Sequence, residues 1–217
     1  MPSHPLLRLY LDAADGIFPP VDGGVTVLPP LAGGLECSVA FTGHAVVATA
    51  VSADDVQGRK PDGYGGSMAP DFLRFLAGSA GWIGVIDATL VSRGTGGTAR
   101  LAPLDDAYGH PRIRYALDVR TDVKVFGDER GLVAVAGGLA GRTELSIELN
   151  DVGEGGRGYG RSLIADALTL VPEGEPVFAA VSPGNARSLR AFLASGFVPV
   201  GSECLIRPAR DALTSHP

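Results

Sequence analysis

The sequence predicts a mixed α/β (α+β) fold, and two observations support this prediction. In the second half, three closely spaced strand patterns precede a glycine-rich loop, and helix, strand, helix and strand patterns follow it. A strand–helix–strand succession forms a right-handed parallel crossover, whereas strands joined by short connections pair antiparallel. The composition agrees, because 45% of the 217 residues are hydrophobic, which is enough for a sizeable core.

The first 110 residues predict a less regular β/α region. Proline and glycine pairs interrupt the first 34 residues, which leave room for at most one short strand. The order strand, GYGG loop, helix, strand repeats that of the second half, so the region is either a degenerate copy of that half or an independent set of elements. The expected elements are strands at 25–28, 35–42, 45–51 and 82–91 and a helix at 71–77 after Pro70.

The second half shows clearer periodicity. Strand 143–150 alternates, with Glu144, Ser146 and Glu148 on one face and Leu145, Ile147 and Leu149 on the other. The expected elements are helices at 111–120, 161–171 and between Asn185 and Gly196, and strands at 122–126, 131–140, 143–150, 176–182 and within 197–207.

Charge, cysteine and hydropathy patterns exclude several classes of protein. The formal net charge of −6 argues against a general nucleic-acid binder. Cys37 and Cys204 are too few for a disulfide framework or a four-thiolate metal site, and the four histidines show no metal-ligand spacing. No segment has the length of a membrane span, and the first residues do not form a signal peptide. We therefore expect a cytoplasmic protein that binds neither membranes nor metal ions.

The glycine-dense segment 151–160 carries the strongest chemical signal. Glycines between a strand and a helix let backbone N–H groups approach an anion, and the positive end of the helix dipole adds to the attraction. Arg157 and Arg161 flank the segment and could add charge-assisted contacts. The segment therefore predicts a phosphate or pyrophosphate site, and the alternative is a hairpin-like loop with solvated arginines.

A nucleotide-binding oxidoreductase is a weaker interpretation of the same segment. Gly153, Gly155 and Gly158 match the spacing of a dinucleotide-binding loop. That motif also needs an acidic residue at the end of the following strand, and strand 177–181 contains none. Neither lysine lies in the GK[ST] context of a Walker loop.

Two segments resemble the GNAT superfamily of acyl-CoA-dependent N-acyltransferases. Residues 158–163, GYGRSL, are similar to its G-x-G-x-x-L pyrophosphate loop, and 177–201 are similar to its second signature of strand, Asn, helix and Gly-Phe. Two positions depart from the pattern, because Gly155 stands where the family usually has Gln or Arg, and Phe192 where it often has Tyr. The resemblance implies a GNAT-like, mostly antiparallel central sheet with a β-α-β crossover and an N-terminal β/α extension. The implied regions are the extension at 1–110, the acyl-CoA-binding core at 111–207 and a tail at 208–217.

By this resemblance, acetyl-CoA (CoA) is the co-substrate, and no metal is required. The pyrophosphate is expected at the amides of residues 155–161, and the pantetheine arm between strand 143–150 and strand 177–181. The residues implied in cofactor binding are Leu149, Asn150, Val152, Gly155, Gly156, Arg157, Gly158, Tyr159, Gly160, Arg161, Asn185, Ser188 and Phe192.

Glu148 and, second, Glu144 are the catalytic residues that the resemblance suggests. An amine must lose a proton before it attacks a thioester, and a carboxylate beside the loop can accept that proton. The alternative is that these residues form a solvated strand edge or pair with Arg120 or Arg142. No general acid is evident, because Phe192 cannot donate a proton. A thiol with a pKa near 8.5 leaves tolerably well without one.

The function expected from the resemblance is transfer of an acetyl group to a primary amine of a small molecule or peptide. The alternative is a catalytically weak or inactive acyl-CoA-binding regulatory module. The acceptor walls are expected in residues 1–110, and apolar surface on the N-terminal hairpin could serve a homodimer.

Overall fold

The computed structural model describes residues 3–150 and 158–210. Contacts divide the chain into two compact units: unit 1 is Thr89–Pro199, and unit 2 combines Pro2–Ala88 with Val200–Pro217. The sequence instead placed the boundaries at 110 and 207. The difference arises because two long strands, β4 (Trp82–Arg93) and β10 (Val198–Arg207), each contribute residues to both units.

Unit 1 contains a mixed, mostly antiparallel sheet, which confirms the predicted fold class. Besides its parts of β4 and β10, its strands are β5 (Ala102–Pro103), β6 (Thr121–Asp128), β7 (Gly131–Gly137), β8 (Thr143–Leu149) and β9 (Pro176–Val181). They are hydrogen-bonded in the order β9-β8-β7-β6-β5. Neighbours from β5 to β8 pair antiparallel, whereas β9 is parallel to β8.

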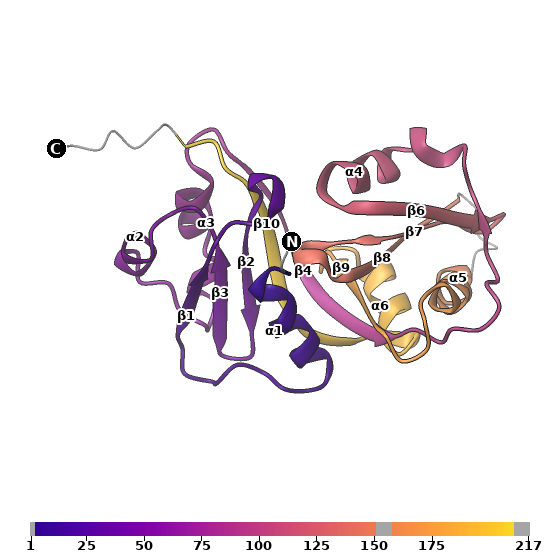
Figure 1. The fold of residues 1–217 in the computed structure, drawn as a ribbon, viewed down its shortest axis with the longest axis horizontal. Helices are drawn as coiled ribbons and strands as arrows, with labels where there is room; N and C mark the ends of the chain where they lie inside the picture. Colours follow the sequence, from indigo (N-terminus) through magenta and orange to yellow (C-terminus); the bar gives the residue numbers. More distant parts are fainter. Residues whose placement is uncertain (1–2, 151–157, 211–217) are drawn as a thin grey trace. The chain divides into compact units, whose positions relative to one another are not determined.

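The α-helices described in unit 1 are α4 (Pro111–Val119), α5 (Tyr159–Ala167) and α6 (Ala186–Ala194). Arginines at the two ends of α4 bond to Glu148 and Ser146 of β8. Alternation places the side chain of Leu149 on the other face of β8, where it lies against Gly160 of α5. Helices α4 and α5 therefore cover opposite faces of the sheet (Figure 1). The succession β8, α5, β9 with parallel strands confirms the predicted crossover.

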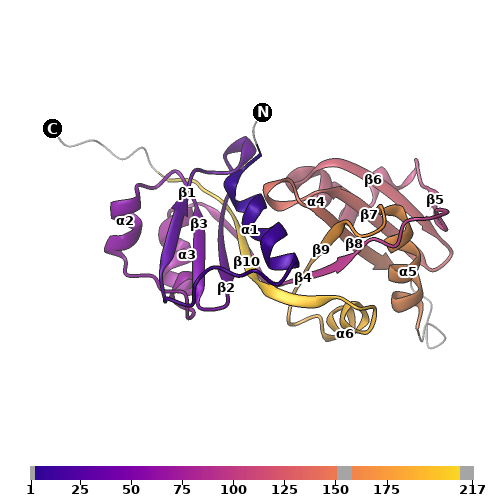
Figure 2. The ribbon, with the colours of Figure 1, turned by 60° about the horizontal axis from the view of Figure 1, so that its bottom comes forward.

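Unit 2 has strands of its own, β1 (Val25–Leu28), β2 (Glu36–Phe41) and β3 (His44–Ala48), together with its part of β10. Their order is β1-β3-β2-β10. The antiparallel pairing of β2 with β3 confirms the predicted hairpin, and β1 is parallel to β3. The α-helices described in this unit are α1 (Pro5–Ala14), α2 (Ala53–Gly58) and α3 (Pro70–Ala77), labelled in Figure 2.

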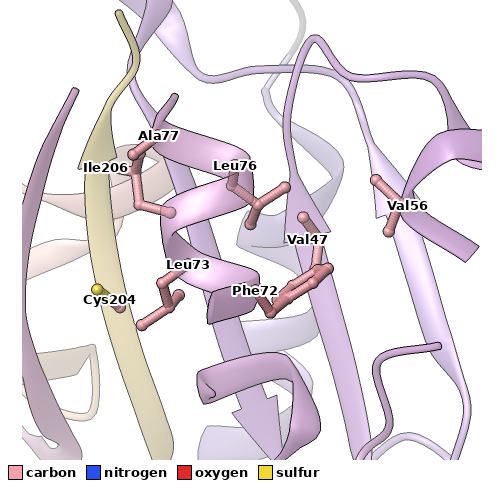
Figure 3. Packing of buried hydrophobic residues seen from close by; sticks show 8 residues of the cluster. All are labelled: Val47, Val56, Phe72, Leu73, Leu76, Ala77, Cys204 and Ile206. Atoms are coloured by element: carbon pink, nitrogen blue, oxygen red, sulfur yellow. The ribbon is translucent and has the colours of Figure 1, made fainter. Parts of the chain in front are cut away.

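The apolar face of α3 packs onto the strands of unit 2 (Figure 3). The residues of this cluster are Val47, Val56, Phe72, Leu73, Leu76, Ala77, Cys204 and Ile206. The thiol of Cys204 lies in the cluster, and its burial, together with the charges of Asp87 and Glu203, raises its pKa to about 11. Neither Cys37 nor Cys204 forms a disulfide, and both are buried.

The sequence prediction misses α1. Pro5 occupies the first turn, where a helix needs no N–H donor. The cap is His4, whose Nδ1 accepts the backbone N–H of Leu6 over 3.2 Å. Leu6 and Tyr10 are fully buried on one face of this helix. Histidine is not a preferred capping residue, so the surrounding prolines and glycines were the stronger signal and gave the wrong result.

Residues 3–150 and 158–210 contain no helix with the length and apolar character needed to cross a membrane. Within the same ranges, no group of three or more His, Cys, Asp or Glu residues is arranged to hold a metal ion. The histidines in these ranges serve local structure instead. His4 and His110 cap α1 and α4, and the buried ring of His44 bonds to Asp22 and Thr26.

Candidate functional site

The parallel pairing of β8 with β9 ends close to where it begins. The ladder between the two strands consists of one pair, Glu144 opposite Phe178, near the start of each strand. Both strands continue past this pair, β8 to Leu149 and β9 to Val181. After this pair, the remaining residues of β8 and β9 form no ladder with each other.

The backbone of β8 offers hydrogen-bond donors along this unpaired stretch. Asn150 donates its N–H to the carbonyl oxygen of Arg130, on the β7 side, over 3.0 Å. Because backbone N–H groups alternate along a strand, those of Ile147 and Leu149 point to the β9 side. Neither has a ladder partner on β9 among the described residues. An extended ligand with amide groups could pair with these donors as a short strand would.

The N-terminus of α5 lies next to the end of β8. A Cβ placed on Gly160 would lie 3.7 Å from Cδ1 of Leu149 and 3.4 Å from Cβ of Ala191 in α6. These are ordinary van der Waals distances, so the helix start is packed against both elements. The end of β8 and the first turn of α5 therefore form one continuous surface.

Gly158 begins α5 in a conformation that favours glycine. Its φ is +94°, in the left-handed region, and it supplies no side chain to cap the helix. The first internal helix bond runs from the Ser162 N–H to the Gly158 carbonyl at 3.0 Å. The amides of residues 159–161 therefore face out of the helix start with the positive end of its dipole. Apart from its neighbours in the chain, no described atom lies within 4 Å of the place that a Cβ on Gly158 would take, and a helix start of this kind suits an anion.

The predicted residues of α6 are placed for helix structure. Asn185 caps α6, because its Oδ1 accepts the Ser188 N–H over 3.1 Å. Phe192 is 2% exposed and packs edge-on against Phe197 with ring centroids 4.9 Å apart. Ser188 is half-buried one turn from the cap. This arrangement explains the Asn and Gly-Phe pattern as a way to fix α6 beside α5.

On the opposite face of the sheet, α4 forms a row of polar contacts with β8. Nε of Arg112 donates to Oε2 of Glu148 over 3.0 Å. Arg120, at the end of the same helix, donates to Oγ of Ser146 over 2.9 Å and pairs with Glu144. The row contains the three polar residues that the alternation of β8 placed on one face. The two candidate bases are therefore both bound to α4, at different ends.

Glu144 is a buried ion-pair partner. Its side chain is 4% exposed and contacts Arg120 and Arg142, the latter over 3.1 Å and itself fully buried. Burial alone would raise the pKa of this carboxyl, but the charges of Arg120 and Arg142 hold it below its ordinary value of 4.5. Such a carboxylate keeps its negative charge and has no room for an amine. This environment does not fit the role of general base predicted for Glu144.

Glu148 is accessible. Its side chain is 41% exposed, that of Arg112 is 39% exposed, and both line a cavity of about 410 Å³ in unit 1. The remaining wall comes from the start of α4, with His110, Pro111 and Tyr115. Of the two predicted bases, only Glu148 can meet a small molecule.

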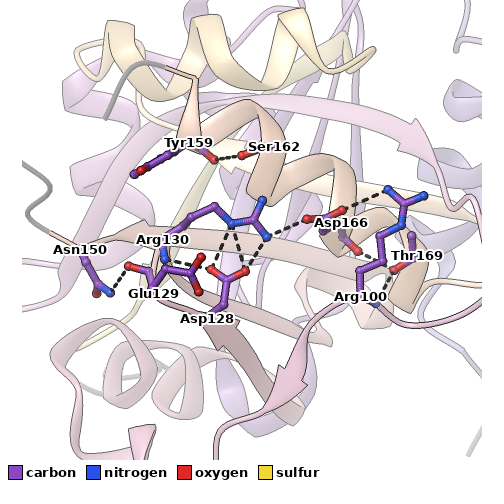
Figure 4. A network of polar contacts seen from close by, with 9 residues as sticks. All are labelled: Arg100, Asp128, Glu129, Arg130, Asn150, Tyr159, Ser162, Asp166 and Thr169. Carbon is purple, nitrogen blue, oxygen red and sulfur yellow. Dashed lines mark hydrogen bonds and ion pairs between the residues drawn. The ribbon is translucent and has the colours of Figure 1, made fainter. Parts of the chain in front are cut away.

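A second ionic network joins the β6–β7 turn to α5, next to the end of β8 (Figure 4). Arg130, in the β6–β7 turn, bonds to Asp128 and reaches Asp166 of α5 over 2.6 Å. These carboxylates raise the pKa of Arg130 above its ordinary value, so its charge is permanent. The side chain of Asn150 donates to the carbonyl of Glu129 in the same turn over 3.0 Å. The turn therefore holds the end of β8 and the body of α5 together.

The structure brings many of the predicted cofactor residues together. Leu149, Gly158, Tyr159, Gly160 and Arg161 lie at the junction of β8 and α5, and Asn150 is bonded to the β6–β7 turn. Val152, Gly155, Gly156 and Arg157 lie outside the described residues. Their predicted roles stay predictions.

The sequence analysis did not anticipate Arg112, His110 or Tyr115. A signal was present in the spacing of the charges. Arg112 and Arg120 are eight residues apart in a helix, about 12 Å, and Glu144 and Glu148 are four residues apart in a strand, about 13 Å. Because the spacing of the two arginines matches that of the two glutamates, two ion pairs side by side would have been predicted once α4 was known to lie on β8.

No family model matches the chain, and no curated protein matches it. Among solved structures, the chain is similar to a candidate acetyltransferase of the GNAT family from Novosphingobium aromaticivorans, with 13% identity and a TM-score of 0.40 over 60% of this chain and 69% of that one. It is also similar to a conserved protein of unknown function from Staphylococcus epidermidis, with 11% identity and a TM-score of 0.39 over 66% of this chain and 68% of that one.

Proposed function

We propose that this chain transfers an acetyl group from acetyl-CoA to a primary amine. The observation that carries the proposal is the early end of the β8–β9 ladder beside a helix start whose glycine cap leaves amides facing outward. Together they offer strand-like pairing for an extended amide-containing arm and an anion site at its end. Acyl-CoA has both features in one molecule.

The chain's own groups have distinct tasks in this proposal. The amides at the start of α5, with Gly158 as the open cap, hold the pyrophosphate. The amides of Ile147 and Leu149 pair with the pantetheine arm, and one of them donates to the thioester carbonyl as negative charge develops on its oxygen. Val152, Gly155, Gly156 and Arg157 belong to the proposed site on the strength of the sequence. Acetyl-CoA supplies the activated acyl group.

Glu148 is the proposed general base. Its carboxylate lies at the end of β8 and lines the cavity next to α4. From there it can accept a proton from an amine, directly or through a water molecule, before the nitrogen attacks the thioester. The neutral amine then forms the C–N bond, the C–S bond breaks to release the thiolate, and the second proton of the nitrogen passes to the departing sulfur or to water, which gives the neutral amide and CoA. Because a thiolate is a fair leaving group, this scheme needs no proton donor at Phe192.

One observation favours the alternative, a binding module without turnover. Glu148 is already paired with Arg112 through Oε2 over 3.0 Å, and this contact favours the charged carboxylate over the protonated form. A regulatory module would keep that pair closed and still bind acyl-CoA. Release of free thiol in the presence of an amine separates the two functions.

Substitution of Gly158 tests the anion site. We expect Gly158→Ala to raise the Kd for acetyl-CoA by about tenfold or more, the effect of losing one charge-assisted hydrogen bond. An alanine at this position has a disfavoured φ of +94°, so the backbone that presents the outward amides is expected to shift. Calorimetric titration of acetyl-CoA into the parent and the variant measures the change.

Gly174→Ala is the matched control. Gly174 also has a positive φ, +79°, and open space around its Cβ position, but it lies in the turn before β9. The two variants should lose similar stability, about 1–2 kcal/mol, and only Gly158→Ala should lose affinity. Equal affinities for both variants and the parent would remove the anion site from the account.

A further inference from the structure

We infer that the amine acceptor is a small amino-carboxylate, a molecule that carries a carboxylate a few bonds from its primary amine. The inference rests on the proposed function, because it assigns the substrate class of the cavity at Glu148. It follows from the Arg112–Glu148 pair in the cavity wall, because an open pair presents one positive and one negative group to a ligand.

The pair is accessible, but both charges are already matched. Nε of Arg112 is 3.0 Å from Oε2 of Glu148, and about two fifths of each side chain is exposed. An exposed pair of this kind contributes little to stability, so it can open at low cost. Among the described residues, Glu148 is the carboxylate bonded to Arg112.

An ammonium group that approaches Glu148 competes with Arg112 for the carboxylate. A simple amine would leave the guanidinium without its counter-charge in a partly enclosed site, which costs free energy. A substrate with both charges avoids this cost, because its ammonium binds Glu148 while its carboxylate binds Arg112. Guanidinium groups suit this task, since they bind carboxylates through two parallel hydrogen bonds.

The rest of the cavity fits the same class of molecule. A volume of about 410 Å³ lies within the range of small-molecule sites. Nδ1 of His110 accepts the Arg112 backbone N–H over 3.2 Å, which holds the ring at the start of α4 beside the cavity that it lines. Tyr115 and Pro111 supply apolar surface. An amino acid of ordinary size meets donors at its carboxylate end and apolar wall at its side chain.

Matched acceptors test the inference. Phenylalanine and phenethylamine, histidine and histamine, and leucine and isoamylamine share a side chain and differ in the carboxylate. With acetyl-CoA present, we expect kcat/KM corrected for the neutral fraction of each amine to favour the amino acid by about tenfold or more in at least one pair, the effect of about 1.4 kcal/mol. Thiol release and product mass give the rates.

Arg112→Gln should remove this preference. The variant keeps a hydrogen-bond donor but no positive charge, so the amino acid loses its partner and the simple amine gains an unopposed Glu148. Arg114→Gln is the matched control on the same helix, because Arg114 is exposed and outside the cavity lining. The control should keep the preference of the parent, which separates a charge effect from a general disturbance of α4.

Two results would overturn the inference. In the first, simple amines match or exceed the amino acids in every pair while acetyl transfer proceeds, which leaves the proposed function intact. In the second, the preference survives in Arg112→Gln. Equilibrium binding of the same pairs without acetyl-CoA applies the test even if no acceptor turns over: tighter amino-acid binding that depends on Arg112 supports the inference, and equal binding or its absence contradicts it. Failure of the proposed function appears separately, as an absence of acetyl-CoA binding.

Discussion

Glu148→Gln is expected to lower kcat about 10²- to 10⁴-fold near neutral pH, the usual contribution of a general base. Glutamine has nearly the same shape and can still accept a hydrogen bond from Arg112, but it cannot take a proton from an ammonium group. The loss of kcat should shrink as the pH rises toward the pKa of the amine, because a neutral amine needs no base. Steady-state rates between pH 6 and 10, with saturating acetyl-CoA, measure this dependence.

Two controls accompany the Glu148 variant. The Kd for acetyl-CoA should stay unchanged, because the carboxylate faces the α4 side and the proposed cofactor site uses the β9 side. Glu173→Gln, the same chemical change at an exposed position, should leave kcat at the parent value. Equal rates for Glu148→Gln and the parent at every pH would exclude Glu148 as the base.

Glu144→Gln is expected to destabilise the fold by about 3–5 kcal/mol, the cost of removing one member of a buried ion pair. The substitution leaves Arg120 and Arg142 buried without their shared counter-charge, and Arg142 lies over the ring of Phe178 with 5.1 Å from Cζ to the centroid. The half-exposed pair at Glu148 gives the comparison, since Glu148→Gln should cost about 0–1 kcal/mol. Urea unfolding midpoints measure both.

The pH dependence of stability provides a second readout of Glu144. Its folded-state pKa lies below the ordinary value of 4.5. The unfolded chain therefore binds more protons than the folded one in this range, and stability falls as the pH decreases below about 4.5. In Glu144→Gln this part of the acid dependence should be absent. If Glu144→Gln and Glu148→Gln unfold at the same urea concentration, the buried ion cluster does not stabilise the fold.

The sequence predicted the parts of the site that depend on local pattern. Alternation alone placed Glu144, Ser146 and Glu148 on one face of β8, and the glycine-dense segment placed a helix start after residue 160, two residues beyond the observed start of α5 at Tyr159. These features follow from the backbone geometry of strands and caps, which neighbouring residues determine. The predicted elements of unit 1 agree with the structure for the same reason.

The different environments of Glu144 and Glu148 could not be predicted in this way. Both are glutamates at equivalent positions of one strand, and their chemistry diverges because the two ends of α4 meet different parts of β8. Arg112 lies 36 residues from Glu148 in sequence, and the third member of the buried cluster, Arg142, comes from the turn before β8. Arg120 and Arg142 were possible partners from the sequence, and both pair with Glu144. Tertiary packing decides which glutamate each arginine meets, and it brings in Arg112, which no local pattern indicated.

The proposed site predicts that acyl-CoA binds along the end of β8 and against the first turn of α5. Hydrogen exchange of individual amides, with and without saturating CoA, tests it directly. We expect slower exchange at Ile147, Leu149 and the amides of residues 159–161, and unchanged exchange in β1 and β3 of unit 2. Unchanged exchange at these amides under saturation, or protection confined to other elements, would contradict the claim.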